Sequence, residues 1–171
     1  MSGLTKALFL DRDGVINIEK NYLYRVEDFE FIDGVFELCK HFQNLGFIIV
    51  VITNQSGIAR GYYSQDDFLK LSSWMVDEFK KQGINISRVY HCPHHPDFSG
   101  ECECRKPKNG MILEAQKDFD IDLKNSVLVG DSESDIEAAI SSNIQQTYLL
   151  SQKNVATKAF KRVEKLKDIL V

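Results

Sequence analysis

The chain has 171 residues, which suits a single domain with one well-filled core. Apolar residues make up 43% and charged residues 27% of it, as in ordinary globular proteins, and a formal net charge of -4 speaks mildly against a nucleic-acid-binding protein. Neither a secretory signal nor the roughly 20 consecutive apolar residues of a membrane span is visible. We therefore expect a cytoplasmic protein, a monomer, with no membrane or nucleic-acid partner.

Short apolar runs and amphipathic segments alternate along the chain. The apolar runs predict β-strands at 6–10, 47–53, 88–92, 126–130 and 146–150. Apolar residues at helical spacing predict helices between them at 35–45, 64–79, 111–119 and 134–141. The tail at about 155–170 is amphipathic and predicts a further helix that packs on the outside.

Strands that alternate with helices predict an α/β fold, a doubly wound parallel sheet with helices on both faces. The run at 47–53 is apolar on both faces, which is typical of a buried parallel strand. No linker, repeat or low-complexity segment interrupts the pattern, so we expect one domain over 1–171. In such sheets ligands bind beyond the carboxyl ends of the strands, and the site should lie there.

Polar residues stand at the ends of the strongest predicted strands. Asp11 and Asp13 follow the first strand, and Thr53 ends the second. Asp131 follows the fourth strand, and Lys106 lies between the third and the fourth. If these strands are neighbours, their side chains converge on one edge of the sheet.

These residue types suit phosphoryl transfer. Asp11, Asp13 and Asp131 offer the hard oxygen ligands that Mg²⁺ prefers, and carboxylates this close repel one another without a cation. Lys106 and Thr53 offer positive charge and a donor for the oxygens of a transferring phosphoryl group. One carboxylate can attack phosphorus, and a second can protonate the leaving oxygen and then activate water. A lone pair of acids often only ends a strand, but here a threonine, a lysine and another acidic motif accompany the pair.

The motifs DRDGV, ITNQ, RKP and VGDSESD occur in this order at the strand ends and resemble the four motifs of the haloacid dehalogenase superfamily. The resemblance covers residues 7 to about 141 and implies a Rossmann-like phosphatase core that needs magnesium. It implies that Asp11 is the nucleophile and a Mg²⁺ ligand. Asp13 would be the general acid/base and would bind Mg²⁺ through its backbone carbonyl. Thr53 and Lys106 would stabilise the phosphoryl group, and Asp131 would complete the magnesium shell.

The same resemblance assigns the residues beside these motifs. Asp135 would support the magnesium shell without binding the ion directly. The residues implied to bind the substrate are Asn54, Gln55, Ser56 and Arg105. The segment after the first strand is too short for a folded cap domain, so we expect an open site.

A cysteine and histidine cluster, CPHHPDFSGECEC, spans residues 92–104. Cys92, His94, Cys102 and Cys104 make a complete tetrahedral shell for Zn²⁺, with His95 as an alternative to His94. A closed shell leaves no position for water, so we expect a structural zinc. Because the RKP motif follows directly, the zinc loop should position the phosphate-binding lysine.

The zinc loop narrows the resemblance to two branches, the histidinol-phosphate phosphatases and the D-glycero-D-manno-heptose 1,7-bisphosphate 7-phosphatases of lipopolysaccharide precursor synthesis. The segments FEFIDGV, TNQSGIARG and CPHHP look like the heptose branch, which implies hydrolysis of the 7-phosphate of a sugar bisphosphate. One residue departs from that branch, because Ser132 stands where many members carry a basic residue.

Two further readings stay open. A zinc-stabilised binding module without catalysis is a non-enzyme alternative, against which the complete set of motif residues speaks. A 3′-phosphatase acting on nucleic acid is another, against which the net charge and the lack of a basic track interleaved with aromatic residues speak.

Overall fold

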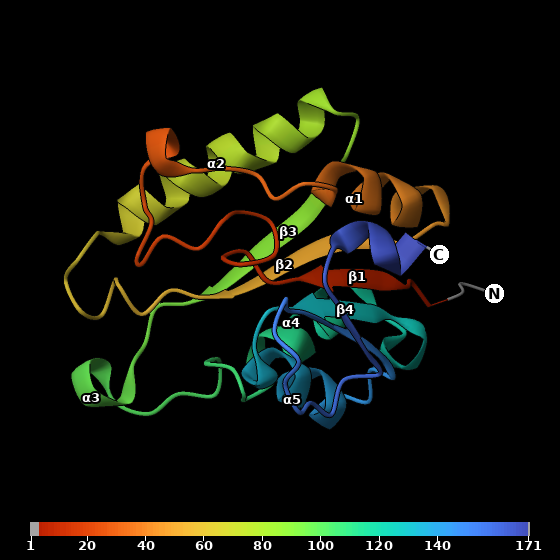
Figure 1. Cartoon of the computed structure of the whole chain (residues 1–171). Helices are drawn as coiled ribbons and strands as arrows, with labels where there is room; N and C mark the ends of the chain where they lie inside the picture. Colours follow the sequence, from red (N-terminus) through yellow and green to blue (C-terminus); the bar gives the residue numbers. More distant parts are fainter. Residues whose placement is uncertain (1–3, 171) are drawn as a thin grey trace.

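The computed structural model describes residues 4–170, so the ends of the expected domain, residues 1–3 and 171, lie outside the described residues. A parallel sheet runs through the middle, with the order β3-β2-β1-β4-β5-β6 (Figure 1). Its strands are β1 (Ala7–Leu10), β2 (Ile48–Asn54), β3 (Ile86–Cys92), β4 (Val127–Gly130), β5 (Gln146–Leu150) and β6 (Lys161–Val163). All neighbouring pairs are parallel, which confirms the predicted α/β fold and the predicted strands.

Helices cover both faces of the sheet (Figure 1). The helices are α1 (Val35–Asn44), α2 (Gln65–Lys81), the short α3 (Pro96–Ser99), α4 (Gly110–Phe119) and α5 (Glu133–Ser141). Short 3-10 helices lie at η1 (Val26–Asp28), η2 (Leu123–Asn125) and η3 (Leu166–Leu170). Helices α1 and α2 pack on one face, and α4 and α5 on the other.

The alternating side chains of the central strand divide the core in two. Leu8 and Leu10 of β1 join the cluster under α1 and α2, whereas Ala7 and Phe9 join the cluster over α4 and α5. All four are fully buried. A strand that is apolar on both faces therefore lies in the middle of the sheet, and the residue that follows it, Asp11, is held in the centre of one edge.

Local signals set where α2 begins. The Ser64 side chain accepts a hydrogen bond from the backbone N–H of Asp67, and the Asp67 carboxylate accepts one from the backbone N–H of Ser64. This capping box is the one that the sequence predicts. Within residues 4–170, none of the helices combines the length and the apolar character that crossing a membrane requires.

The predicted C-terminal helix at about 155–170 is wrong. The segment instead forms β6, which pairs with β5 through Leu150 and Val163, and then the 3-10 helix η3. Its buried residues Val163, Leu166 and Ile169 are spaced by three, which fits a strand end followed by a 3-10 helix with three residues per turn. Pairing also covers the edge of β5, which an outer helix would have left open.

Candidate active site

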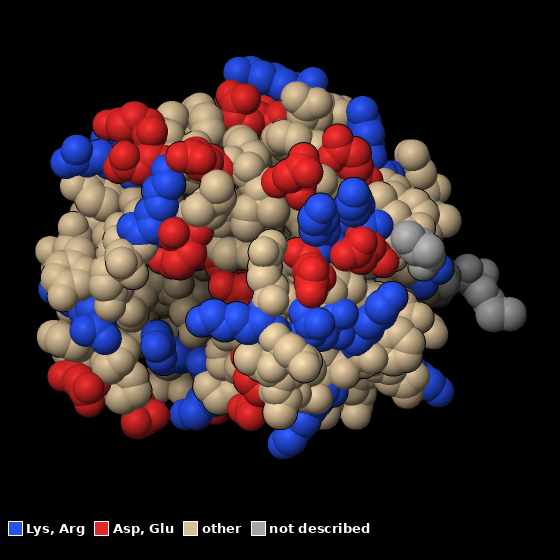
Figure 2. Space-filling view, viewed as in Figure 1, with Lys and Arg blue, Asp and Glu red and all other residues tan. Residues whose placement is uncertain are grey.

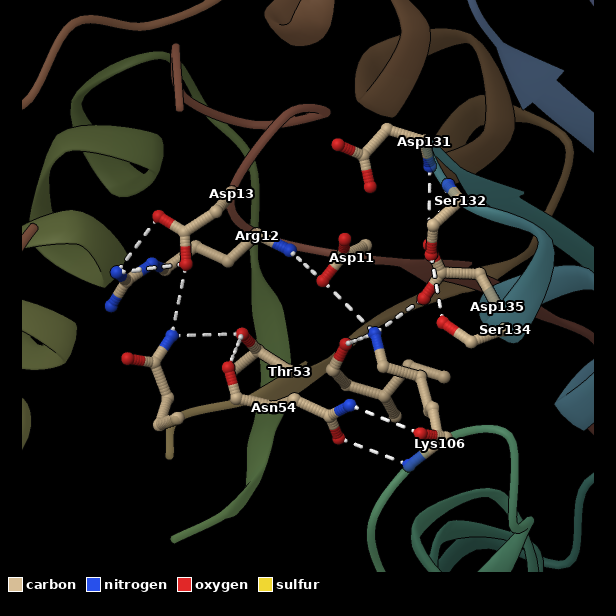
Figure 3. Close-up of polar contacts among 12 residues, drawn as sticks. Asp11, Arg12, Asp13, Thr53, Asn54, Lys106, Asp131, Ser132, Ser134 and Asp135 are labelled. Atoms are coloured by element: carbon tan, nitrogen blue, oxygen red, sulfur yellow. Dashed lines mark hydrogen bonds and ion pairs between the residues drawn. The ribbon is translucent and has the colours of Figure 1, made fainter. Parts of the chain in front are cut away.

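The predicted catalytic side chains converge at the carboxyl ends of β1, β2 and β4 (Figure 3). Asp11 follows β1, Thr53 is the last residue but one of β2, and Asp131 follows β4. Strand β1 lies between β2 and β4, so the two strand ends that flank Asp11 supply the other groups. Lys106 reaches the same point from the loop before α4. The structure thus brings together residues that are up to 120 positions apart in the sequence.

A buried ion-pair network joins Asp11, Lys106 and Asp135. The Lys106 Nζ lies 3.0 Å from Asp11 Oδ1 and 2.5 Å from Asp135 Oδ1, and it also donates to the Ile52 carbonyl oxygen at 3.1 Å. The Lys106 side chain is only 3% exposed. Three acceptors therefore fix the ammonium group, and Lys106 presents its charge directly beside the predicted nucleophile.

Both carboxylate oxygens of Asp135 accept hydrogen bonds from the protein. Its Oδ2 accepts from the backbone N–H groups of Asp131 and Ser132, at 3.1 and 3.2 Å, and from the Ser132 hydroxyl at 3.1 Å. Its Oδ1 is engaged by Lys106. This arrangement agrees with a supporting role, in which Asp135 positions the ammonium group and the start of α5. Ser132, which stands where a basic residue was expected, has a structural role here because its N–H and hydroxyl hold Asp135.

The carboxylates of Asp11, Asp131 and Asp135 lie close enough to repel one another. Burial, followed by the charge of Asp135, raises the pKa of Asp11 well above its usual value. Burial and Asp135 also raise the pKa of Asp131 to about 6. Burial acts to lower the pKa of Lys106, but the carboxylates of Asp11 and Asp135 together raise it above its usual value. The site therefore carries more negative charge than its one lysine balances, and a cation would relieve the excess.

The donor set and the space around it fit a magnesium ion. Carboxylate oxygens of Asp11, Asp131 and Asp135 lie within 4.8 Å of one another. Gly14 leaves room for this group, since a Cβ atom there would lie 1.9 Å from Asp131 Oδ2, and its φ of +92° favours glycine. A side chain at position 14 would displace the Asp131 carboxylate.

The raised pKa of Asp131 predicts a stability profile for the magnesium-free protein. Its folded value of about 6 lies above the usual 3.8, so between these values the folded state binds more protons than the unfolded state. Stability should therefore fall as the pH rises through this window. Because Mg²⁺ binds the charged carboxylates, it should raise Tm more at about pH 7.5 than at about pH 5. Thermal unfolding with and without magnesium checks this, and Asp131→Asn should remove most of the difference. An equal magnesium effect at both pH values would contradict the expectation.

Asp13 is held by donors that the sequence did not identify. Arg12 Nη2 donates to both of its carboxylate oxygens, at 2.9 and 3.1 Å, and Asn17 Nδ2 donates to Oδ1 at 3.0 Å. Gln55 Nε2 donates to Oδ2, also at 3.0 Å. Arg12 is 1% exposed and Asn17 fully buried. An arginine between two aspartates normally predicts a solvated side chain, so no local signal marked Arg12 as a partner of Asp13.

The residues after β2 have divided roles. Asn54 holds the backbone of Lys106 from both sides, because its Oδ1 accepts from the Lys106 N–H at 3.0 Å and its Nδ2 donates to the Lys106 carbonyl at 3.3 Å. Gln55 is buried and faces Asp13 and Thr53. Ser56 lines an open cavity. Asn54 also lines that cavity, so these residues remain predicted substrate contacts.

Two adjoining cavities open over the carboxylates. One, of about 170 Å³, is lined by Asp11, Asp13, Glu19, Asn54, Lys106, Asp131, Ser132, Ser134 and Asp135. The other, of about 270 Å³, is lined by Asp13, Glu19, Asn21, Tyr22, Asn54, Gln55, Ser56 and Tyr63. Among the described residues, Arg105 lines neither cavity, and its Nη1 donates to the His94 carbonyl at 3.4 Å. The two cavities share Asp13, Glu19 and Asn54 in their linings, and the smaller one gives access to Asp11.

The predicted zinc ligands are brought together in part. Cys92 and Cys104 are joined as a disulfide, and the Cys102 sulfur lies 3.6 Å from each of theirs. His94 lies outside this group, with its Nδ1 3.3 Å from the Ser99 hydroxyl. His95, the alternative ligand, accepts from the backbone N–H of Asp97 at the start of α3. A disulfide and a pair of metal-bound thiolates are alternative states of the same two sulfurs, so the cluster can hold a metal when reduced.

A family model and a relative match nearly the whole chain. The model of the family described as polynucleotide kinase 3 phosphatase matches residues 7–168. The D-glycero-alpha-D-manno-heptose-1,7-bisphosphate 7-phosphatase of Campylobacter jejuni is 52% identical over 166 residues, which are 97% of this chain and 94% of that protein.

Solved structures share the fold over its full extent. A had-like phosphatase from Mesorhizobium loti has a TM-score of 0.88 and 29% identity, covering 98% of this chain and 85% of that one. The D,D-heptose 1,7-bisphosphate phosphatase of B. bronchiseptica, complexed with magnesium and phosphate, has a TM-score of 0.83 and 26% identity, covering 97% and 98%. These matches confirm the resemblance drawn from the four motifs.

Proposed function

We propose that this chain removes the 7-phosphate of D-glycero-D-manno-heptose 1,7-bisphosphate. The chain belongs to the polynucleotide kinase 3 phosphatase family of haloacid dehalogenase phosphatases. The observation that carries this proposal is the meeting of Asp11, Lys106 and Asp131 at one cavity beside the strand ends. The 52% identity to a heptose bisphosphate phosphatase supports the choice of substrate. The reaction would serve the synthesis of the activated heptose precursor of lipopolysaccharide, in the cytoplasm, by a monomer.

The reaction proceeds in two displacements. An Asp11 oxygen attacks phosphorus, the bond to the sugar oxygen breaks, and Asp13 gives that oxygen a proton. Asp13 then takes a proton from a water molecule that attacks the aspartyl-phosphate, which releases phosphate and restores Asp11. Lys106 and Thr53 hold the oxygens of the phosphoryl group through both steps.

Asp11, Asp131 and the backbone carbonyl of Asp13 would hold Mg²⁺. When bound, the ion supplies positive charge that lets an anionic carboxylate approach an anionic phosphate. Its positive charge also offsets the excess of carboxylates described above. Asp135 supports this site from behind, through Lys106 and the backbone of Asp131.

The cavity of about 270 Å³ beside the phosphate position recognises the rest of the substrate. Asn54, Gln55 and Ser56 line it. We expect Arg105 to contact the substrate's distal phosphate, because a guanidinium pairs well with phosphate. The Ser132 hydroxyl donates its hydrogen bond to Asp135 and so does not replace the basic residue expected there as a substrate contact. The anomer preference therefore depends on the loops around the cavity.

Removal of zinc from the loop at 92–104 should lower the activity of the active site, although the zinc does not lie in it. We expect the reduced protein to bind one Zn²⁺ through Cys92, Cys102, Cys104 and His94. Structural zinc orders its loop, so its removal by a chelator should lower Tm, and activity should fall because Lys106 lies two residues beyond Cys104. Metal analysis of protein purified under reducing conditions checks the ligands, with His94→Ala compared against His95→Ala. Equal zinc loss in both variants, or in neither, would contradict the choice of His94.

A substrate panel tests the proposed function. Phosphate release is measured with magnesium on the α and β anomers of the heptose bisphosphate, on histidinol phosphate and on a 3′-phosphorylated oligonucleotide. We expect the highest kcat/KM on a heptose bisphosphate, with phosphate lost from C7. A higher kcat/KM on histidinol phosphate would mean that the chain is a histidinol-phosphate phosphatase. If phosphate were released from none of the compounds, a binding module without catalysis would be favoured.

The oligonucleotide is included because the family description names a polynucleotide phosphatase. Figure 2 shows lysine and arginine side chains intermixed with aspartate and glutamate over the face drawn. The formal net charge of -4 points the same way. A surface of this kind offers little of the sequence-independent attraction on which nucleic-acid binding depends, so we expect the oligonucleotide to be a poor substrate.

A further inference from the structure

A buried tyrosine outside the predicted catalytic set, Tyr63, lies against the active site. It is 7% exposed and sits in the loop before α2. Its ring stacks on that of Tyr24, with centroids 5.5 Å apart and planes 13° apart. On another side Gly57 approaches so closely that a Cβ there would lie 2.1 Å from Tyr63 Cε1. The ring is therefore fixed, and its hydroxyl has one place to point.

The hydroxyl of Tyr63 determines how Gln55 is turned. It donates a hydrogen bond to Gln55 Oε1. On the other end of the amide, Gln55 Nε2 donates to Asp13 Oδ2 at 3.0 Å and to the Thr53 hydroxyl at 2.9 Å. A donor at Oε1 requires that the NH₂ group face Asp13 and Thr53. Burial raises the pKa of Tyr63 to about 12, so the hydroxyl remains a donor at neutral pH.

We propose that Tyr63 is a positioning residue that acts through Gln55 to aim the Asp13 carboxylate at the leaving oxygen and at the attacking water. The inference rests on the proposed function, in which Asp13 is the acid and base. Without the Tyr63 hydroxyl, Gln55 can rotate and turn its own carbonyl oxygen toward Asp13, which repels a carboxylate. Arg12 and Asn17 still hold Asp13, but its Oδ2 loses the donor that ties it to Thr53.

The two displacements depend on Asp13 differently, which gives the inference a kinetic signature. A sugar oxygen needs a proton from Asp13 in order to leave, whereas nitrophenolate is a good leaving group and needs none. Hydrolysis of the aspartyl-phosphate needs Asp13 as a base for either substrate. Misplacing Asp13 should therefore slow both steps with the sugar phosphate but only the second step with p-nitrophenyl phosphate.

The test compares Tyr63→Phe with Tyr90→Phe in the full chain. Tyr90 is also buried and donates to Asp118 Oδ2 at 2.7 Å on the α4 side of the sheet, so its variant loses a similar hydrogen bond away from the site. For Tyr63→Phe we expect kcat on the sugar bisphosphate to fall about tenfold with KM nearly unchanged. In rapid mixing with p-nitrophenyl phosphate, the first nitrophenolate per chain should appear at the wild-type rate, and the steady phase should slow about tenfold. Tyr90→Phe should match the wild type in both assays.

Other results would overturn the inference. It fails if Tyr63→Phe slows the first nitrophenolate and the steady phase equally, or if KM rises while kcat is unchanged. If Tyr63→Phe does not fold, Gln55→Met removes the same link from its other end and is held to the same rapid-mixing pattern with p-nitrophenyl phosphate. A wild-type protein that turns over p-nitrophenyl phosphate but no heptose bisphosphate would refute the substrate, while the rapid-mixing result would still decide the role of Tyr63.

Discussion

Replacing Asp11 by asparagine should lower phosphatase turnover by at least about 10⁴-fold, because loss of a nucleophile removes the covalent route altogether. The amide is close in shape to the carboxylate and can still accept a hydrogen bond from Lys106, which keeps its bond to Asp135. The fold should therefore persist. Steady-state phosphate release and trapping of the phosphoenzyme measure the effect.

A matched control is available on the surface. Asp77 is exposed on α2, away from the strand ends, so Asp77→Asn makes the same chemical change without touching the site. It should retain wild-type turnover. If Asp11→Asn kept even a few per cent of the activity, the assignment of the nucleophile would be wrong.

Replacing Lys106 by methionine should reduce both activity and stability. The variant leaves Asp11 and Asp135 buried without their shared cation, and breaking a buried ion pair from one side costs about 3–5 kcal/mol in the free energy of unfolding. The cost should shrink toward low pH, where Asp11, whose pKa is raised by burial, takes up a proton. Denaturant unfolding in magnesium-free buffer at two pH values measures it, and loss of phosphate release follows from the missing charge at the phosphoryl group.

Two further variants separate charge from packing. Lys117 is exposed on α4, so Lys117→Met should leave both properties unchanged. The double variant Lys106→Met with Asp135→Asn removes one of the stranded charges and should recover part of the stability without recovering activity. A single Lys106→Met variant as stable as the wild type would mean that the buried carboxylates do not need the ammonium group.

The family and the residues that meet at the sheet edge could be predicted because they depend on short local patterns. An apolar run followed by DRDG predicts a buried strand with acids at its end, and a parallel sheet places the carboxyl ends of its strands at one edge. Asp11, Lys106 and Asp131 do meet, although Asp11 and Lys106 are 95 positions apart. The helix start at Ser64 was equally local, since a capping box needs only four consecutive residues.

The sequence by itself therefore determined five of the parallel strands, the helices between them and the motif residues that meet at the sheet edge. Only the tertiary structure decided that the tail forms β6 and η3, because the open edge of β5 was invisible in the local spacing of apolar residues. It also decided that Arg12 turns inward to Asp13, and that Tyr63 reaches Asp13 through Gln55. The tail depends on long-range strand pairing, and Arg12 and Tyr63 depend on the burial of polar side chains. Packing between distant segments sets the pairing and the burial, and neighbouring residues do not.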